Sequence, residues 1–201
     1  PALIELADDN DGWKVFLVSS GLTFFVGGLL VLFAYDERPP RIGVKEGFLL
    51  TTLSWLVITA FGALPFLGHG LNYTDAYFET MSGLTTTGAT VMSGLDKLPR
   101  GILLWRALLN GFGGLGIIVI AIIMLPFLRV GGMQLFQTES SDKSEKVLPR
   151  AFELTLATAG IFGLLVLVCA GFYTWFGMSG FDAICHAMAT LATGGFSNYD
   201  A

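Results

Sequence analysis

The stretch at residues 73–96, YTDAYFETMSGLTTTGATVMSGLD, decides how the rest of the chain is interpreted. Its first half predicts a short helix, which Thr74 or Asp75 could cap and which ends near Leu84. Such a helix is about 16 Å long, about half of the ~30 Å hydrocarbon thickness of a bilayer. Residues 85–90 are hydroxyl-rich with one glycine, a composition of poor helix propensity. The helix can therefore enter a membrane but cannot cross it.

A half-spanning helix followed by a Thr/Gly turn is typical of a re-entrant pore loop. Non-helical backbone at membrane depth is tolerated only where protein buries it or where it lines a watery cavity. The C-terminal end of the helix carries partial negative charge, and carbonyls of the turn can replace the water around a cation. An ordinary amphipathic helix in an extracellular loop is the alternative, which one copy alone leaves open.

The chain contains a second copy of this element at residues 182–197, DAICHAMATLATGGFS. A shift of 107 residues places identical residues on one another: Asp75 on Asp182, Ala76 on Ala183, Met81 on Met188, Thr86 on Thr193 and Gly88 on Gly195. Repetition of so unusual an element favours two pore loops. The candidate ion-binding residues are Thr85, Thr86, Thr87, Gly88, Ala89 and Thr90 in the first turn, and Ala192, Thr193, Gly194, Gly195, Phe196 and Ser197 in the second.

The composition predicts an all-α polytopic membrane protein. The 201 residues are 53% hydrophobic and 13% charged, which is too apolar for a soluble domain of this size. The net charge is −5 and the basic residues form no dense run beside aromatics, so nucleic acid is not an expected partner. Cys169 and Cys185 lie in or beside apolar segments without metal-ligand spacing, and we interpret both as buried structural thiols.

Apolar segments predict spanning helices at residues 13–35, 47–68, 101–128 and 151–176, with Pro65 ending or kinking the second. The expected domain organisation is an N-terminal segment with one additional transmembrane helix (1–46), a first helix/pore-loop/helix repeat (47–128), a cytoplasmic loop (129–150) and a second repeat truncated after its pore loop (151–201). Because the chain begins at Pro1 and ends soon after the second turn, we expect a fragment of a longer chain.

Basic residues predict the orientation of the chain. The inside loops would hold Arg38, Arg41, Lys45, Arg129, Lys143, Lys146 and Arg150, and the outside segments only Lys14, Lys97 and Arg100. Seven against three satisfies the positive-inside rule and puts both pore loops on the outer side. Five acidic residues are then expected to line the outer approaches and concentrate cations there: Asp75, Glu79, Asp96, Asp182 and Asp200.

Three further features bear on the site. The simplest interpretation of Arg106 is a side chain that snorkels to the outer surface, and the alternative is pairing with an Asp or Glu near the pore mouth. We interpret His69 as a solvated loop residue and His186 as a packed or water-facing histidine. Residues 111–116 match G-x-G-x-x-G without any βαβ context, so they favour close helix packing around a pore or its loop over nucleotide binding.

These motifs resemble the Trk/Ktr/HKT family of potassium transporters, most closely its bacterial TrkH branch. The resemblance covers nearly the whole chain and is most specific at TDAYFETMSGLTTTGAT (74–90), GFGGLGIIV (111–119), PFLRVGGMQL (126–135) and ATGGFSNYDA (192–201). It implies four repeats around one pore in a bacterial inner membrane, a homodimer, and a cytosolic nucleotide-binding ring subunit of the TrkA type that regulates it. The third and fourth repeats would lie outside these residues.

The resemblance implies potassium uptake, no enzyme activity, and no cofactor apart from the transported ion. Potassium would be bound by the backbone of Thr86, Thr87, Gly88, Thr193, Gly194 and Gly195. Both turns lack the second glycine of the Thr-Val-Gly-Tyr-Gly filter of potassium channels, so discrimination against sodium is expected to be looser. Passive transport and symport with sodium or protons both stay open.

Two other classes of function compete with this one. A non-transporting structural membrane subunit would leave the repeated turns unexplained. An intramembrane metal or cofactor enzyme would use His69, His186 and nearby acids, but the sequence holds no H-E-x-x-H or G-x-S-x-G motif.

Overall fold

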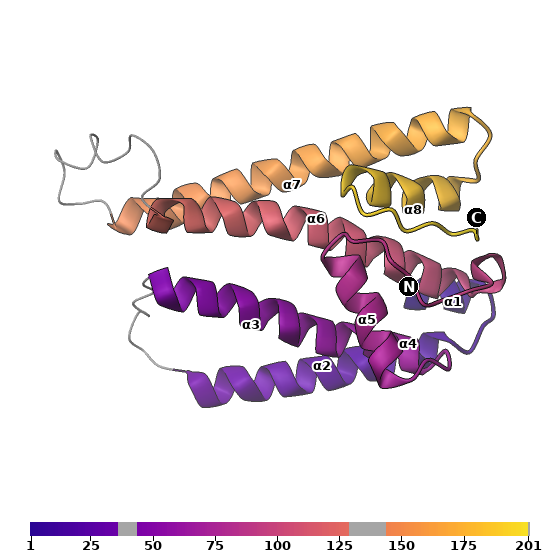
Figure 1. Ribbon diagram of the computed structural model, residues 1–201, viewed down its shortest axis with the longest axis horizontal. Coiled ribbons are helices and arrows are strands. Elements are labelled where there is room, and N and C mark those ends of the chain that lie inside the picture. Colours follow the sequence, from indigo (N-terminus) through magenta and orange to yellow (C-terminus); the bar gives the residue numbers. More distant parts are fainter. Residues whose placement is uncertain (36–43, 129–143, 201) are drawn as a thin grey trace.

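The computed structural model describes residues 1–35, 44–128 and 144–200, without the side chains of 44, 122–128 and 144–151. All regular elements in this part are helical, and the long ones lie side by side (Figure 1), so the predicted all-α membrane fold is confirmed. In chain order the elements are α1 (Ala2–Ala7), α2 (Trp13–Ala34), α3 (Val44–Gly62), α4 (Leu64–Leu67), α5 (Tyr73–Leu84), the 3-10 helix η1 (Leu95–Lys97), α6 (Arg100–Leu128), α7 (Ser144–Trp175) and α8 (Gly180–Leu191).

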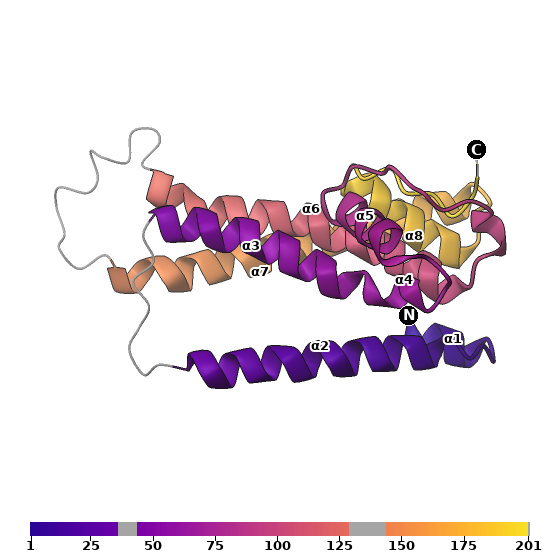
Figure 2. The same cartoon turned by 60° about the horizontal axis from the view of Figure 1, so that its bottom comes forward.

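Within the residues that the structure describes, four helical segments are long and apolar enough to cross a membrane, at Trp13–Ala34, Lys45–Leu67, Arg100–Ala121 and Phe152–Trp175. They correspond to the four predicted spans. Helix α2 lies at the edge of the bundle (Figure 2), where large apolar side chains such as Phe24 and Phe33 are exposed. Hydrocarbon can solvate such side chains where water cannot, because lipid tails are as apolar as leucine.

Pro65 interrupts the second span, as its lack of a backbone N–H predicts. Helix α3 ends at Gly62, and Pro65 lies in the first turn of the short α4. The indole Nε1 of Trp105 in α6 donates to the Gly62 carbonyl at 3.0 Å, which satisfies one of the acceptors that the helix end leaves open. Ala63 and Phe66 are fully buried at this junction, so the break lies inside the protein core rather than in lipid.

The two half-spanning helices, α5 and α8, coincide under the 107-residue shift from their first residue to their last. Their N-caps correspond too, because the Asn72 side chain accepts from the Asp75 N–H and the Ser179 side chain accepts from the Asp182 N–H. The prediction that Thr74 or Asp75 caps the first helix was therefore wrong: Asn72, two residues before Thr74, has the extended backbone that a cap requires.

Both half-helices lie in the same half of the bundle, away from the start of α3 and the end of α6 (Figure 1). Much of the predicted inside surface, including Arg38, Arg41, Arg129 and Lys143, lies outside the described residues. The predicted loop 129–150 is wrong for residues 144–150, which belong to α7. Glu, Lys and Arg are good helix formers, so a charged run indicates water contact rather than loss of helix.

Candidate functional site

The glycine-rich part of α6 lets the C-terminal ends of both half-helices approach this helix closely. A Cβ at Gly113 would overlap the carbonyl oxygen of Leu84 at the end of α5. A Cβ at Gly114 would lie 2.8 Å from the Cβ of Ala192, directly after α8. The prediction of close packing against the pore loops is thus confirmed for these two glycines, and α6 fixes where both turns begin.

The two turns have the same backbone conformation. Thr86 and Gly88 have φ angles of 54° and 77°, and the residues 107 positions later, Thr193 and Gly195, have 53° and 78°. Glycine adopts the left-handed region without penalty, whereas a residue with a Cβ loses about 1–2 kcal/mol there. Two strained threonines at equivalent positions indicate that both turns are held by their surroundings in one required shape.

Hydrogen bonds close each turn onto its half-helix in the same way. The Thr87 N–H donates to the Ser82 carbonyl at 2.9 Å, and the Gly194 N–H donates to the Ala189 carbonyl at 2.7 Å. Such bonds satisfy carbonyls that a helix C-terminus leaves open. Within the described part of the chain, no hydrogen bond uses the carbonyl oxygens of Thr86, Thr87, Gly88, Thr193 or Gly195. These oxygens remain available for an ion.

Other candidate residues have carbonyls or side chains that the protein itself uses. The Ala89 carbonyl accepts from the Ser82 hydroxyl at 2.6 Å, and the Ser197 carbonyl accepts from Arg106 Nη1 at 2.8 Å. Phe196 is buried, and its ring lies 3.0 Å from the position that a Cβ at Gly83 would take. Through these contacts, Ala89, Phe196 and Ser197 hold the two turns against the rest of the protein.

The structure contradicts two expectations about charged residues, because Glu79 and Arg106 form a buried ion pair. Arg106 Nε lies 2.9 Å from Glu79 Oε1, and the two side chains are 1% and 0% exposed. Glu79 does not line the outer approach, since Thr90 Oγ1 and the Val91 N–H also donate to its carboxylate. Arg106 does not snorkel; its alternative interpretation, pairing with an acid near the turns, is the one observed.

The second copy replaces the carboxylate at this position with an imidazole. His186 occupies the place of Glu79 under the 107-residue shift and lies half-buried, with Nε2 3.4 Å from the Ser197 hydroxyl and its ring stacked on Tyr199. Nδ1 lies 2.9 Å from the Asp182 carbonyl oxygen. The sequence predicts a packed or water-facing histidine, and these contacts show a packed one.

The remaining predicted acids lie in the first turns of α5 and α8, in η1 and after the second turn. Asp96 and Asp200 are exposed, and Asp75 and Asp182 are half-buried. Burial raises the pKa of Asp182, but hydrogen bonds from Ser179, Asn198 and Tyr199 outweigh it and lower the pKa below its ordinary value. Asp182 therefore stays charged near neutral pH, as a residue that concentrates cations would need to.

Little in the described part of the chain favours a metalloenzyme. No group of three His, Cys, Asp or Glu side chains there could hold a metal ion.

His69 is half-buried rather than solvated as expected: its Nδ1 lies 3.0 Å from the Pro65 carbonyl, so the loop folds back onto α4. Cys185 is buried and Cys169 half-buried, which agrees with structural thiols.

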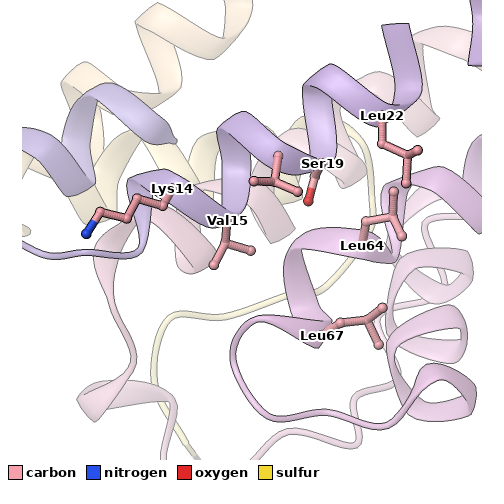
Figure 3. Close-up of a pocket in the computed structure, with 7 residues that line it drawn as sticks. Lys14, Val15, Ser19, Leu22, Leu64 and Leu67 are labelled. Atoms are coloured by element: carbon pink, nitrogen blue, oxygen red, sulfur yellow. The ribbon is translucent and has the colours of Figure 1, made fainter. Parts of the chain in front are cut away.

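A separate groove of about 370 Å³ lies between α2 and α4 (Figure 3), and no residue of either turn lines it. Its lining is almost entirely apolar and consists of Lys14, Val15, Val18, Ser19, Leu22, Leu64 and Leu67. Lys14 at its outer end forms an exposed ion pair with Asp11, with Nζ 2.6 Å from Oδ1. The groove offers no convergent polar groups for chemistry.

Comparisons with known proteins agree with one family. A family model described as "TrkH: Cation transport protein" matches residues 14–201. The chain is 43% identical over 206 residues to the Trk system potassium uptake protein TrkH of Halomonas elongata, and 46% identical over 210 residues to that of Escherichia coli strain K12. Both alignments cover the whole chain but only 42% of the relative.

A solved structure shares the fold. The crystal structure of the potassium transporter TrkH from Vibrio parahaemolyticus matches with a TM-score of 0.86 and 38% sequence identity. The match covers 100% of this chain and 40% of that one. The chain thus spans less than half the length of the relatives that it matches.

Proposed function

Because the chain belongs to the TrkH family of cation transport proteins, we propose that it forms part of a pore for potassium uptake. Its relatives are named as potassium uptake proteins. The observation that carries the proposal is the pair of equivalent turns, each at the C-terminal end of a half-spanning helix. Each turn has carbonyl oxygens that accept no hydrogen bond within the described residues.

Potassium is the ion that such a pair of turns suits. A carbonyl carries only a partial negative charge, and several together can replace the hydration shell of a weakly hydrated cation. We propose that the backbone of Thr86, Thr87 and Gly88 and that of Thr193, Gly194 and Gly195 bind the ion. The other residues of the two turns, Thr85, Ala89, Thr90, Ala192, Phe196 and Ser197, then shape the filter, and the engaged carbonyls of Ala89 and Ser197 support a shorter filter than that of a potassium channel.

We propose that residues 47–128 and 151–201 are successive repeats around this pore, preceded by an N-terminal segment at 1–46 and separated by a cytoplasmic segment at 129–150. Equal half-helix lengths, nearly equal turn angles and the location of both half-helices in the same half of the bundle support this division. The pore loops would face outward from a bacterial inner membrane, as the bias in basic residues favours.

The names of the relatives place them in a Trk system, which supports a transporter that works with other components. We propose, from the family resemblance, that the full-length protein is a homodimer and that a cytosolic nucleotide-binding ring subunit regulates it. If the protein were a purely structural membrane subunit, its repeated turns would have no explanation. If it were an intramembrane enzyme, it would need a cluster of catalytic or metal-binding side chains, and the described residues contain none.

Uptake of potassium in cells that lack their own potassium transporters tests the proposal. The full-length protein should restore growth at low external potassium, and purified protein in liposomes should conduct potassium in preference to sodium. Absence of any potassium flux, with protein present in the membrane at normal abundance, would overturn the proposal.

A further inference from the structure

Arg106 is the side chain through which helix α6 contacts both turns at once. Its Nε donates to Glu79 in α5 at 2.9 Å, its Nη2 lies 3.3 Å from Thr90 Oγ1 after the first turn, and its Nη1 donates to the Ser197 carbonyl after the second turn at 2.8 Å. Its guanidinium carbon lies 4.2 Å from the centroid of the Phe196 ring. Thr90 and Ser197 are equivalent under the 107-residue shift, so the contacts reach matching points of the two turns.

The Glu79 carboxylate accepts the other hydrogen bonds of the same network. Thr90 Oγ1 lies 2.8 Å and 3.0 Å from its two carboxylate oxygens, and the Val91 N–H donates to Oε2 at 3.1 Å. Both charged groups are fully buried, so their interaction is not weakened by water. A planar guanidinium with several N–H groups in a rigid fork suits such a site, whereas an ammonium is a point charge on a flexible stem.

The second repeat has no comparable acid at this position. His186 replaces Glu79, and its contact with the Ser197 hydroxyl is longer, at 3.4 Å. The Ser197 carbonyl is instead held by Arg106 of the first repeat. Among the described residues, the outer ends of both turns therefore depend on one ion pair.

We propose that Glu79 and Arg106 act as a positioning pair that fixes the spacing between the first and second turns and thereby sets the preference for potassium over sodium. This inference rests on the proposed function. Neither side chain is available to touch the ion, since both are enclosed behind the turns. Their effect on selectivity passes through Thr90 and Ser197, whose positions determine where the preceding carbonyls point.

Arg106→Lys in the full-length protein separates positioning from folding. The lysine keeps the buried charge beside Glu79, so the variant should reach the membrane at normal abundance. A single ammonium cannot hold Glu79, Thr90 and the Ser197 carbonyl together, so the potassium-to-sodium uptake ratio should fall about fivefold to tenfold. Glu79→Gln should lower the ratio in the same direction. Lys97→Gln is the matched control: Lys97 is exposed near the outer end of α6, and its loss should leave the ratio unchanged.

The outcomes distinguish this inference from the function on which it rests. If the wild-type protein and Lys97→Gln show no preference for potassium, the proposed filter fails. If both discriminate and Arg106→Lys and Glu79→Gln discriminate equally well at matched abundance, the filter stands and the positioning pair is refuted. If Arg106→Lys does not accumulate, the Glu79→Gln ratio decides, and a variant that accumulates with unchanged ratio refutes the inference. If neither variant accumulates, the pair serves folding and the inference is overturned.

Discussion

The carbonyl oxygen of Gly194 occupies the space that a Cβ at Gly88 would need. The two residues belong to different repeats, so the first turn can pass the second at this distance only because residue 88 is glycine. The equivalent position in the second turn is less crowded: a Cβ at Gly195 would lie 4.0 Å from the nearest atom, the Cα of Gly88. Two residues equivalent by sequence and by backbone angle thus differ in what surrounds them.

Gly88→Ser should therefore impair selectivity more than Gly195→Ser. Both variants place a side chain at a left-handed φ angle, which costs about 1–2 kcal/mol, but only the first also forces Gly194 to move. We expect the potassium-to-sodium uptake ratio to fall about tenfold in Gly88→Ser and less in Gly195→Ser. The measurement is uptake by full-length variants at matched expression in cells without other potassium transporters. Unchanged ratios in both would mean that these turns are not the filter.

Gly113→Ser should affect assembly more than ion preference. The added Cβ overlaps the Leu84 carbonyl, and overpacking of this kind costs about 1–3 kcal/mol. Lower abundance and a lower melting temperature in detergent are expected, with the potassium-to-sodium ratio of the surviving protein close to normal. Gly163→Ala in α7 is the control, because a Cβ there meets no atom within 4 Å and alanine favours the helix. A melting temperature as low in Gly163→Ala would contradict the packing explanation.

Asp200→Ala should loosen the segment between the first turn and α6. The Asp200 carboxylate accepts from the Gly94 N–H at 2.7 Å and from the Leu95 N–H at 3.3 Å, across more than 100 residues of sequence. Hydrogen bonds to a charged group stabilise by about 1.5–3 kcal/mol, so amide hydrogen exchange at residues 94 and 95 should become about tenfold faster. Mass spectrometry of peptic peptides measures this, with the peptide of α5 as the internal control. Equal exchange in the two proteins would show that the contact is absent in the membrane protein.

Thiol labelling tests the orientation. In full-length protein whose native cysteines, Cys169 and Cys185 included, are all replaced by alanine, single cysteines at Ser93 and Glu46 lie at opposite ends of the bundle, and both positions are exposed. A membrane-impermeant reagent added to intact cells should label Ser93→Cys and spare Glu46→Cys. The reverse pattern would invert the topology and place the turns inside.

Apolar segments predict the four spans, and the 107-residue repeat locates both half-helices and the glycines at 88 and 195. Local sequence is sufficient there, because helix length and left-handed glycine are local properties. The left-handed angles of Thr86 and Thr193 were not predicted, because threonine disfavours that region and only the surrounding packing enforces it. The only signal in the sequence was that Thr86 and Thr193 are equivalent under the 107-residue shift.

The burial of Glu79 and Arg106 was not predicted for a related reason, and their pairing was kept only as the alternative for Arg106. An arginine near the end of a spanning helix commonly reaches the surface, and an acid in an outer helix commonly faces water. Which side of each helix faces the other depends on tertiary packing, and here the glycines of α6 determine it by admitting α5 so closely. If burial of either Glu79 or Arg106 had been predicted, burial of the other would have followed, because a buried charge needs a partner of opposite charge.

The order of contacts around Arg106 has a consequence for biosynthesis. Its counter-ion, Glu79, precedes it in the chain, so a ribosome delivers the negative charge to the membrane before the positive one. Helix α6 can then be inserted as a neutral unit with α5, which avoids the cost of an unpaired charge in the bilayer. The Ser197 carbonyl is synthesised 91 residues after Arg106. The contact between Arg106 and the second turn can therefore form only after the second repeat has been synthesised.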